Sequence, residues 1–113
     1  MLKRIEVEYN GQRVVLSEAT TAMSIRREFL RPDNISFADV EQRIAGKVFY
    51  PDIMACVVET EGFETWPPTV EAFVNEWPAR FTDKLRDTCY ELNPHWWMSF
   101  EETEVKKKEV TRP

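Results

Sequence analysis

Hydrophobic and polar residues alternate on both sides of the dipeptide Asn10-Gly11, near the start of the chain. The alternation over residues 4–9 and 12–16 has the two-residue period of a β-strand, and Asn-Gly tolerates the positive φ angles of a type I′ turn. The sequence therefore predicts a β-hairpin, whose apolar face must rest on the remaining chain because an isolated hairpin is only marginally stable. The predicted cross-strand pairs are Tyr9–Gln12, Glu8–Arg13, Val7–Val14 and Ile5–Leu16.

After the hairpin, the apolar residues recur at helical spacing. Ser17 is suited to cap a first helix that runs to about Leu30, and Pro32 stops it because proline cannot continue a helix. One stripe of this helix is expected to face the core, and it consists of Ala19, Ala22, Met23, Arg26, Phe29 and Leu30.

A second helix is expected to begin at residues 36–39, which resemble a capping box with the shorter carboxylate of Asp39. Its apolar positions are Phe37, Val40, Ile44 and Val48. Pro51 should break or restart this helix, and Pro51-Asp52 suits the first turn of a third helix that Gly62 ends. The third helix would bury Ile53, Met54, Val57 and Val58, and a buried strand over the same apolar run is the open alternative.

Two more helices are predicted. Thr69 can cap a short helix with Val70, Phe73 and Val74, and Trp77-Pro78 opens a longer helix that Asn93-Pro94 closes. The longer helix is expected to bury the apolar positions Phe81, Leu85, Cys89 and Leu92, which recur every three or four residues. Its exposed face is expected to carry Arg80, Asp83, Lys84, Arg86, Asp87 and Glu91.

Residues 101–113 differ from the preceding chain, because they combine many charges with two valines and no aromatic residue. Such a segment cannot bury enough apolar surface to be ordered by itself. A chain of 113 residues is expected to have one core. The predicted fold class is therefore α+β: a single domain over residues 1–100, with the N-terminal β-hairpin packed on a small bundle of four to five helices, and a disordered charged tail over residues 101–113.

The charge balance argues against binding to nucleic acid. Twenty acidic and fifteen basic residues leave a formal charge of -5, and the one basic cluster, Lys106 to Lys108, is bracketed by glutamates that cancel its field. The N-terminus becomes acidic before any apolar run develops, unlike a signal peptide, and the longest apolar run, residues 53–58, is too short to span a membrane. We therefore expect a cytoplasmic protein that binds neither nucleic acid nor membrane.

Residues suited to catalysis or metal binding are scarce. His95 is the only histidine, in a position where an imidazole packs or faces solvent, and Cys56 and Cys89 lack the C-x-x-C spacing of a redox or zinc site. The two cysteines are expected to be buried free thiols. The three glycines are isolated, so there is no phosphate-binding loop. We expect no enzymatic activity, metal or cofactor.

Aromatic residues gather at or beyond the predicted helix boundaries. Tryptophans at such junctions commonly pack in the core, but if they are exposed they form the kind of apolar patch that marks a partner site. The segment after Pro94 is so apolar that it must fold back on the body, pack against another copy or dock on a partner. The candidate partner-binding residues are Trp96, Trp97, Met98, Phe100, Trp66 and Trp77.

About half of the chain resembles the tail assembly chaperones of long-tailed bacteriophages. In that family an apolar helix ends in an acidic-glycine turn and is followed by a Thr-Val-x-x-Phe segment, a Leu/Trp-Pro helix start and a helix ending in Leu-Asn. The corresponding stretches here, in the same order, are residues 51–58, Glu61-Gly62, residues 68–73, Trp77-Pro78-Ala79 and Glu91-Leu92-Asn93-Pro94. The family is largely helical, whereas the residues before Ser17 favour a hairpin, so α+β is retained.

The resemblance implies a protein of the host cytoplasm that coats the tape-measure protein and recruits tail-tube subunits without entering the virion. It also implies a longer form made by ribosomal frameshifting, for which the codons of Lys106 to Lys108 are a candidate slippery run; a solvated charge run is the alternative. An assembly chaperone would hold a long helical partner through apolar anchors, with many copies adding avidity, and a homo-oligomer is one form that it could take. The alternatives are a small cytoplasmic adaptor that regulates or inhibits one folded protein, and a minor enzyme that uses Cys89 or His95.

Overall fold

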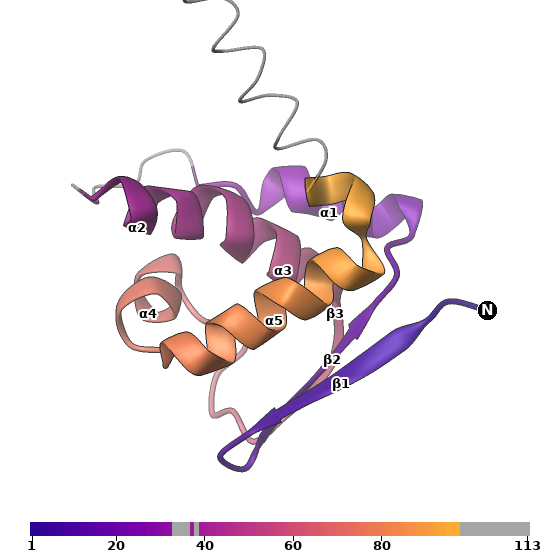
Figure 1. Ribbon diagram of the computed structural model, residues 1–113, viewed down its shortest axis with the longest axis horizontal. Helices are drawn as coiled ribbons and strands as arrows, with labels where there is room; N and C mark the ends of the chain where they lie inside the picture. Colours follow the sequence, from indigo (N-terminus) through magenta and orange to yellow (C-terminus); the bar gives the residue numbers. More distant parts are fainter. Residues whose placement is uncertain (33–36, 38, 98–113) are drawn as a thin grey trace, which may run out of the picture.

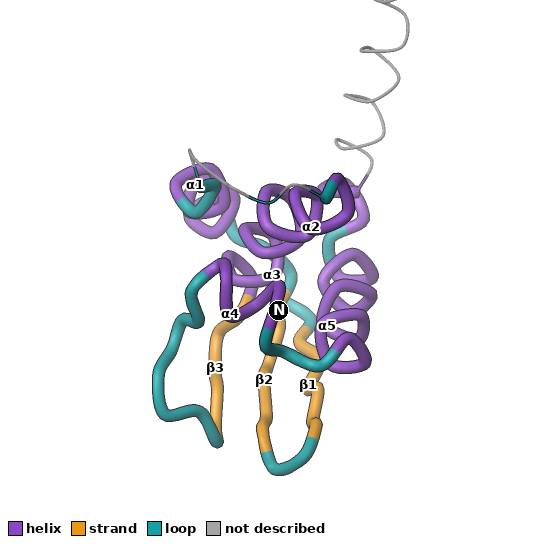
Figure 2. Tube along the Cα trace, turned by 90° about the vertical axis from the view of Figure 1, so that its left-hand side faces the viewer, coloured by secondary structure: helices purple, strands orange, loops and turns teal. Residues whose placement is uncertain are grey.

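The computed structural model describes residues 1–32, 37 and 39–97, and it has the predicted α+β fold (Figures 1 and 2). Three antiparallel strands form one sheet in the order β1-β2-β3: β1 (Arg4–Tyr9), β2 (Gln12–Ser17) and β3 (Val57–Glu61). The helical elements are α1 (Thr21–Phe29), α2 (Val40–Ile44), the π-helical turn η1 (Ala45–Phe49), α3 (Tyr50–Cys56), α4 (Val70–Asn75) and α5 (Ala79–Leu92). Residues 94–97 are also helical. The tail expected over residues 101–113 lies outside the described range.

The predicted hairpin is confirmed, including its register. Tyr9 pairs with Gln12, Val7 with Val14 and Ile5 with Leu16. The two turn residues have positive φ angles, 47° at Asn10 and 81° at Gly11, as a type I′ turn requires. The apolar face of the hairpin packs on α5 and α3, with Val7, Val14 and Leu16 buried.

The third predicted helix is only half right, because α3 ends at Cys56 and the chain continues as strand β3. β3 pairs with the free edge of β2, so Val57 lies opposite Leu16 and Val14 opposite Thr60. β-Branched residues favour this extended pairing, which satisfies the backbone groups that the hairpin edge would otherwise leave unpaired. Gly62 therefore ends a strand, at a point where a Cβ atom would lie 2.5 Å from the carbonyl oxygen of Gly11.

The first predicted helix is wrong at its start and in the orientation of its central turns, although Ala19 and Leu30 of its predicted stripe pack against the core. Ser17 is the last residue of β2 and is fully buried, and Thr20 caps α1 instead by accepting a hydrogen bond from the Met23 N–H. α1 has no buried residue, and Phe29, predicted to face the core, is 84% exposed. The side chain that α1 directs inward is Arg27, which meets Asp52 of α3.

The segment from α2 to α3 is one continuous helical path. Asp39 caps its start through the Glu41 N–H, while Ser36 lies outside the described residues. Pro51 lies in the first turn of α3, as predicted, but the path does not break there. The wider hydrogen-bonded turn of η1 immediately precedes this proline, and such a turn accommodates the missing N–H and the bulk of the ring.

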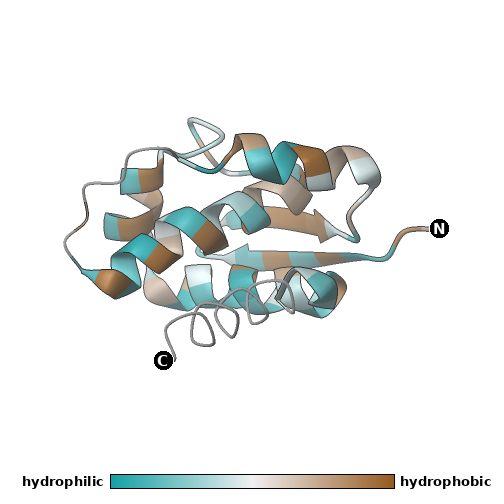
Figure 3. Ribbon diagram, turned by 90° about the horizontal axis from the view of Figure 1, so that it is seen from above, coloured by the Kyte–Doolittle hydropathy of each residue, from teal (hydrophilic) through white to brown (hydrophobic). Residues whose placement is uncertain are grey.

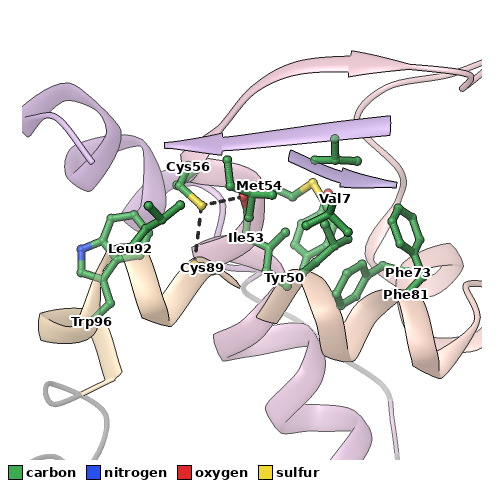
Figure 4. Close-up of a cluster of buried hydrophobic side chains, with 14 residues drawn as sticks. Val7, Tyr50, Ile53, Met54, Cys56, Phe73, Phe81, Cys89, Leu92 and Trp96 are labelled. Carbon is green, nitrogen blue, oxygen red and sulfur yellow. Dashed lines mark hydrogen bonds between the residues drawn. The ribbon is translucent and has the colours of Figure 1, made fainter. Parts of the chain in front are cut away.

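The predicted α4 and α5 are confirmed. Thr69 caps α4 through the Ala72 N–H, and Phe73 is buried. α5 lies along the sheet and buries Phe81, Leu85, Cys89 and Leu92, whereas Asp83, Lys84 and Asp87 are exposed. α3 lies fully in the core, in contact with β2 and α5 (Figure 4). The core therefore joins the hairpin to the helices in one domain.

Candidate protein-binding site

An open apolar groove lies between the α2-η1 helix and α5. Its volume is about 470 Å³. A neighbouring hollow of about 390 Å³ shares three of its residues, Phe49, Arg86 and Trp97, and extends it past Asp87 and Tyr90. The residues that line the larger hollow are Glu41, Ile44, Ala45, Phe49, Phe73, Thr82, Asp83, Arg86 and Trp97.

The π-helical turn shapes one wall of this groove. Hydrogen bonds from residue i to i+5 widen the turn, so side chains five positions apart, such as Ile44 and Phe49, come onto one side. The opposite wall is regular, since Thr82 and Arg86 lie one turn apart on α5. Phe73 of α4 closes the floor from within the core.

Charged groups surround the apolar floor. The Arg86 guanidinium lies 5.5 Å from the centre of the Phe49 ring and within 3.5 Å of the carboxylates of Asp83 and Asp87. The rim carries the three carboxylates of Glu41, Asp83 and Asp87 and the guanidinium of Arg86, so its net charge is two negative charges. The groove is thus suited to an apolar side chain flanked by basic groups.

Trp96 and Trp97, two adjacent residues that the sequence predicts for a partner site, have different environments. Trp96 is 2% exposed, and its ring lies 4.7 Å from the Arg27 guanidinium of α1, so the core alternative holds for it. Trp97 is 36% exposed, lines both hollows and stacks edge-on against Tyr90 at 5.3 Å. The two other candidates of this segment, Met98 and Phe100, lie outside the described residues.

Trp66 and Trp77 belong to a separate aromatic cluster. Their ring centres are 5.9 Å apart, and each also packs on Phe63, at 4.9 and 5.6 Å respectively. Trp77 then contacts Phe81 and Phe73 of the core. Both tryptophans are half-buried and hold the loop after β3 onto the domain. The four predicted site residues that the structure describes therefore do not form one surface.

Sequence reasoning missed most of the groove. Ile44 was assigned to a buried stripe, Arg86 to a solvated face, and Phe49 to neither. A regular helical period cannot place Ile44 and Phe49 together, because five residues in an α-helix span about 1.4 turns. Only the π-helical turn brings them to the same wall, and the one local hint was the proline at position 51.

The buried cysteines contact each other, and the buried polar side chains form a small network of their own. The predicted buried free thiols are confirmed: the Cys56 and Cys89 sulfurs are 3.5 Å apart in the core (Figure 4). Tyr90 donates a 2.6 Å hydrogen bond to Asp52, which also lies 3.0 Å from the Arg27 Nε. Within the residues described, no cluster of three or more His, Cys, Asp or Glu side chains could hold a metal ion.

No protein-family model, no curated protein and no solved structure matches this chain. Among residues 1–32, 37 and 39–97, no helix is long and apolar enough to cross a membrane.

Proposed function

We propose that this chain is a non-catalytic tail assembly chaperone, which binds a helical segment of the tape-measure protein in the groove between α2-η1 and α5 and recruits tail-tube subunits in the host cytoplasm. The observation that carries this proposal is the open apolar groove with Trp97 at its edge. The family resemblance of residues 51–94 supplies the identity of the partner.

The shape and charge of the groove favour an amphipathic helix as its occupant. Apolar side chains at i, i+3 or i+4 would enter the two adjoining hollows, on either side of Phe49 and Arg86. Basic residues flanking these anchors would meet Glu41, Asp83 and Asp87 on the rim. Each site is small, so repeated binding of many copies along one long helical partner would supply the avidity.

Co-purification with the tape-measure protein encoded nearby tests the proposal. Trp97→Ser and Ile44→Ser should each weaken capture of that protein by roughly tenfold or more, since both remove apolar anchors from the groove. Lys84→Ser is the matched control, because Lys84 is exposed on α5 and does not line the groove. Melting temperatures of all variants separate lost binding from lost folding.

Two results would count against the proposal. Failure of the unmodified chain to bind or solubilise the tape-measure protein would overturn the chaperone function, and full binding by folded Trp97→Ser and Ile44→Ser variants would move the site elsewhere. Stoichiometry distinguishes the adaptor alternative, since a chaperone binds in many copies per partner and an adaptor in one. A contribution of the acidic rim should appear as weaker capture at higher salt.

A further inference from the structure

α1 is an amphipathic helix that turns its apolar side to solvent. Phe29 is 84% exposed and Ile25 54% exposed, and with 3.6 residues per turn the two lie on one stripe, together with exposed Ala22 one turn earlier. The usual arrangement is the reverse, with the apolar stripe toward the core. In the view of Figure 3, α1 runs along an edge of the molecule.

A buried ion pair fixes this orientation. Arg27 lies about 180° around the helix from the centre of the Ile25-Phe29 stripe, and its side chain is only 12% exposed. It meets Asp52 at 3.0 Å and the Trp96 ring at 4.7 Å. A rotation of α1 that buried Phe29 would therefore expose Arg27 and leave Asp52 in the core without its partner, which is costly.

The charges that flank the stripe indicate what covers it. Arg26 and Glu28 are both exposed and lie about 80° to either side of the stripe. If two α1 helices lie side by side in the same direction, about a twofold axis parallel to them, each Arg26 meets Glu28 of the other. In an antiparallel pair, like charges would share each flank. The Arg31–Glu28 contact of 3.5 Å, an exposed pair, does not prevent this exchange.

We propose that α1 is a self-association surface, through which two copies of this chain pair in parallel with Phe29 and Ile25 at the centre. No residue of α1 lines the groove between α2-η1 and α5, so this pairing is independent of the proposed function. One short helix per copy makes a small interface, and the dimer is therefore weak and concentration-dependent.

Sedimentation velocity of the full chain over a wide range of concentrations tests the pairing. The unmodified protein should shift from monomer to dimer, and Phe29→Ser should raise the dissociation constant by roughly tenfold or more with no loss of thermal stability, since this side chain is exposed. Lys84→Ser should leave the dimer unchanged. A protein that stays monomeric at every concentration, or a dimer unaffected by Phe29→Ser, overturns the proposal.

Three further variants test the pairing and the direction of the helices. In a parallel pair Ala22 lies opposite its own copy, so Ala22→Cys should form an intermolecular disulfide under mild oxidation, whereas the unmodified chain, with both thiols buried, should not. Arg26→Glu and Glu28→Arg should each weaken self-association, and their equimolar mixture should restore it. Absence of the Ala22→Cys crosslink in a dimeric sample overturns the parallel arrangement.

Discussion

Asp52 is the residue on which the interior polar network depends. Its carboxylate is 4% exposed, accepts the Tyr90 hydroxyl at 2.6 Å and lies 3.0 Å from the Arg27 Nε. That nitrogen has no aligned hydrogen-bond acceptor, so the contact with Arg27 is an ion pair without a directed hydrogen bond. Burial raises the pKa of Asp52 and outweighs the opposing effects of Tyr90 and Arg27.

This pKa shift predicts how stability depends on pH. The folded protein holds the Asp52 proton more tightly than the unfolded chain, in which the carboxyl has its ordinary pKa of 3.8. The contribution of Asp52 to the unfolding free energy is therefore largest below pH 3.8, and it falls as the pH rises through the raised pKa of the folded protein. The stability of the unmodified protein relative to Asp52→Asn should fall over this interval and then level off. Denaturant titrations between roughly pH 3 and 7 measure it.

Asp83→Asn is the control for this experiment, because Asp83 is exposed. A stability difference between the unmodified protein and Asp52→Asn that instead grows as the pH rises would mean that the attraction of Arg27 exceeds the effect of burial.

The two cysteines should be unreactive in the native protein. Both are fully buried, and the hydrogen bond between Cys89 and Cys56, followed by burial, raises the pKa of the Cys89 thiol. Since the thiolate is the reactive species, a thiol reagent such as dithiobis(nitrobenzoate) should label neither cysteine until the protein unfolds, and should label both in denaturant. Rapid labelling of the native chain would contradict the closed packing between α3 and α5.

At the scale of elements, α5 supplies the central side chains of the core. Leu85 is fully buried in the same cluster as Phe81 and Cys89. Leu85→Ala should lower the unfolding free energy by roughly 2 to 5 kcal/mol, because the change leaves a cavity as well as removing apolar contacts. Lys84→Ala on the exposed face should change it by less than about 0.5 kcal/mol. Equal unfolding midpoints for the two variants would show that this face of α5 is not the buried one.

The continuous helical path from α2 to α3 contributes both to the core and to the groove. Its C-terminal part, α3, is fully buried, whereas η1 contributes Ala45 and Phe49 to the wall of the groove. A uniform α-helix would keep one phase along its whole length, and the π-helical turn changes that phase between the two parts. The binding groove proposed here therefore depends on an irregularity within the element.

At the scale of the whole molecule, Trp96 joins the C-terminal end of the described chain to α1. Its buried ring covers the Arg27 guanidinium, which in turn holds α1 against α3. Trp96→Ser should therefore lower stability by about 3 to 5 kcal/mol, as large aromatic truncations in cores do. Trp97→Ser, at the groove edge, should cost much less, and thermal melts of the two variants provide the comparison. The opposite ranking would show that Trp97, and not Trp96, holds the C-terminal turn in place.

The two proposed surfaces lie on different elements. The groove is lined by α2, η1, α4, α5 and Trp97, whereas the self-association stripe lies on α1. A dimer paired through α1 would not use the residues that line the groove, so that two paired copies could hold two segments of the same partner. This arrangement links weak pairing to the avidity that the proposed function requires.

The sequence by itself determined the hairpin, α4 and α5. Asn10-Gly11 selects its own turn, and the spacing of Phe81, Leu85 and Leu92 is a local property that needs no knowledge of the rest of the chain. The fold class followed from these elements, because an apolar hairpin face requires helices to cover it.

Tertiary structure alone decided the remaining features. Val57–Glu61 became a strand because β2 had a free edge beside it, and α1 turned Phe29 outward because Asp52 in the core required Arg27. Ile44 and Phe49 share one wall because η1 widens the helix. In each case the deciding partner or backbone geometry is absent from the local pattern, and a periodicity in the sequence reports the spacing of apolar residues but not which neighbour they will meet.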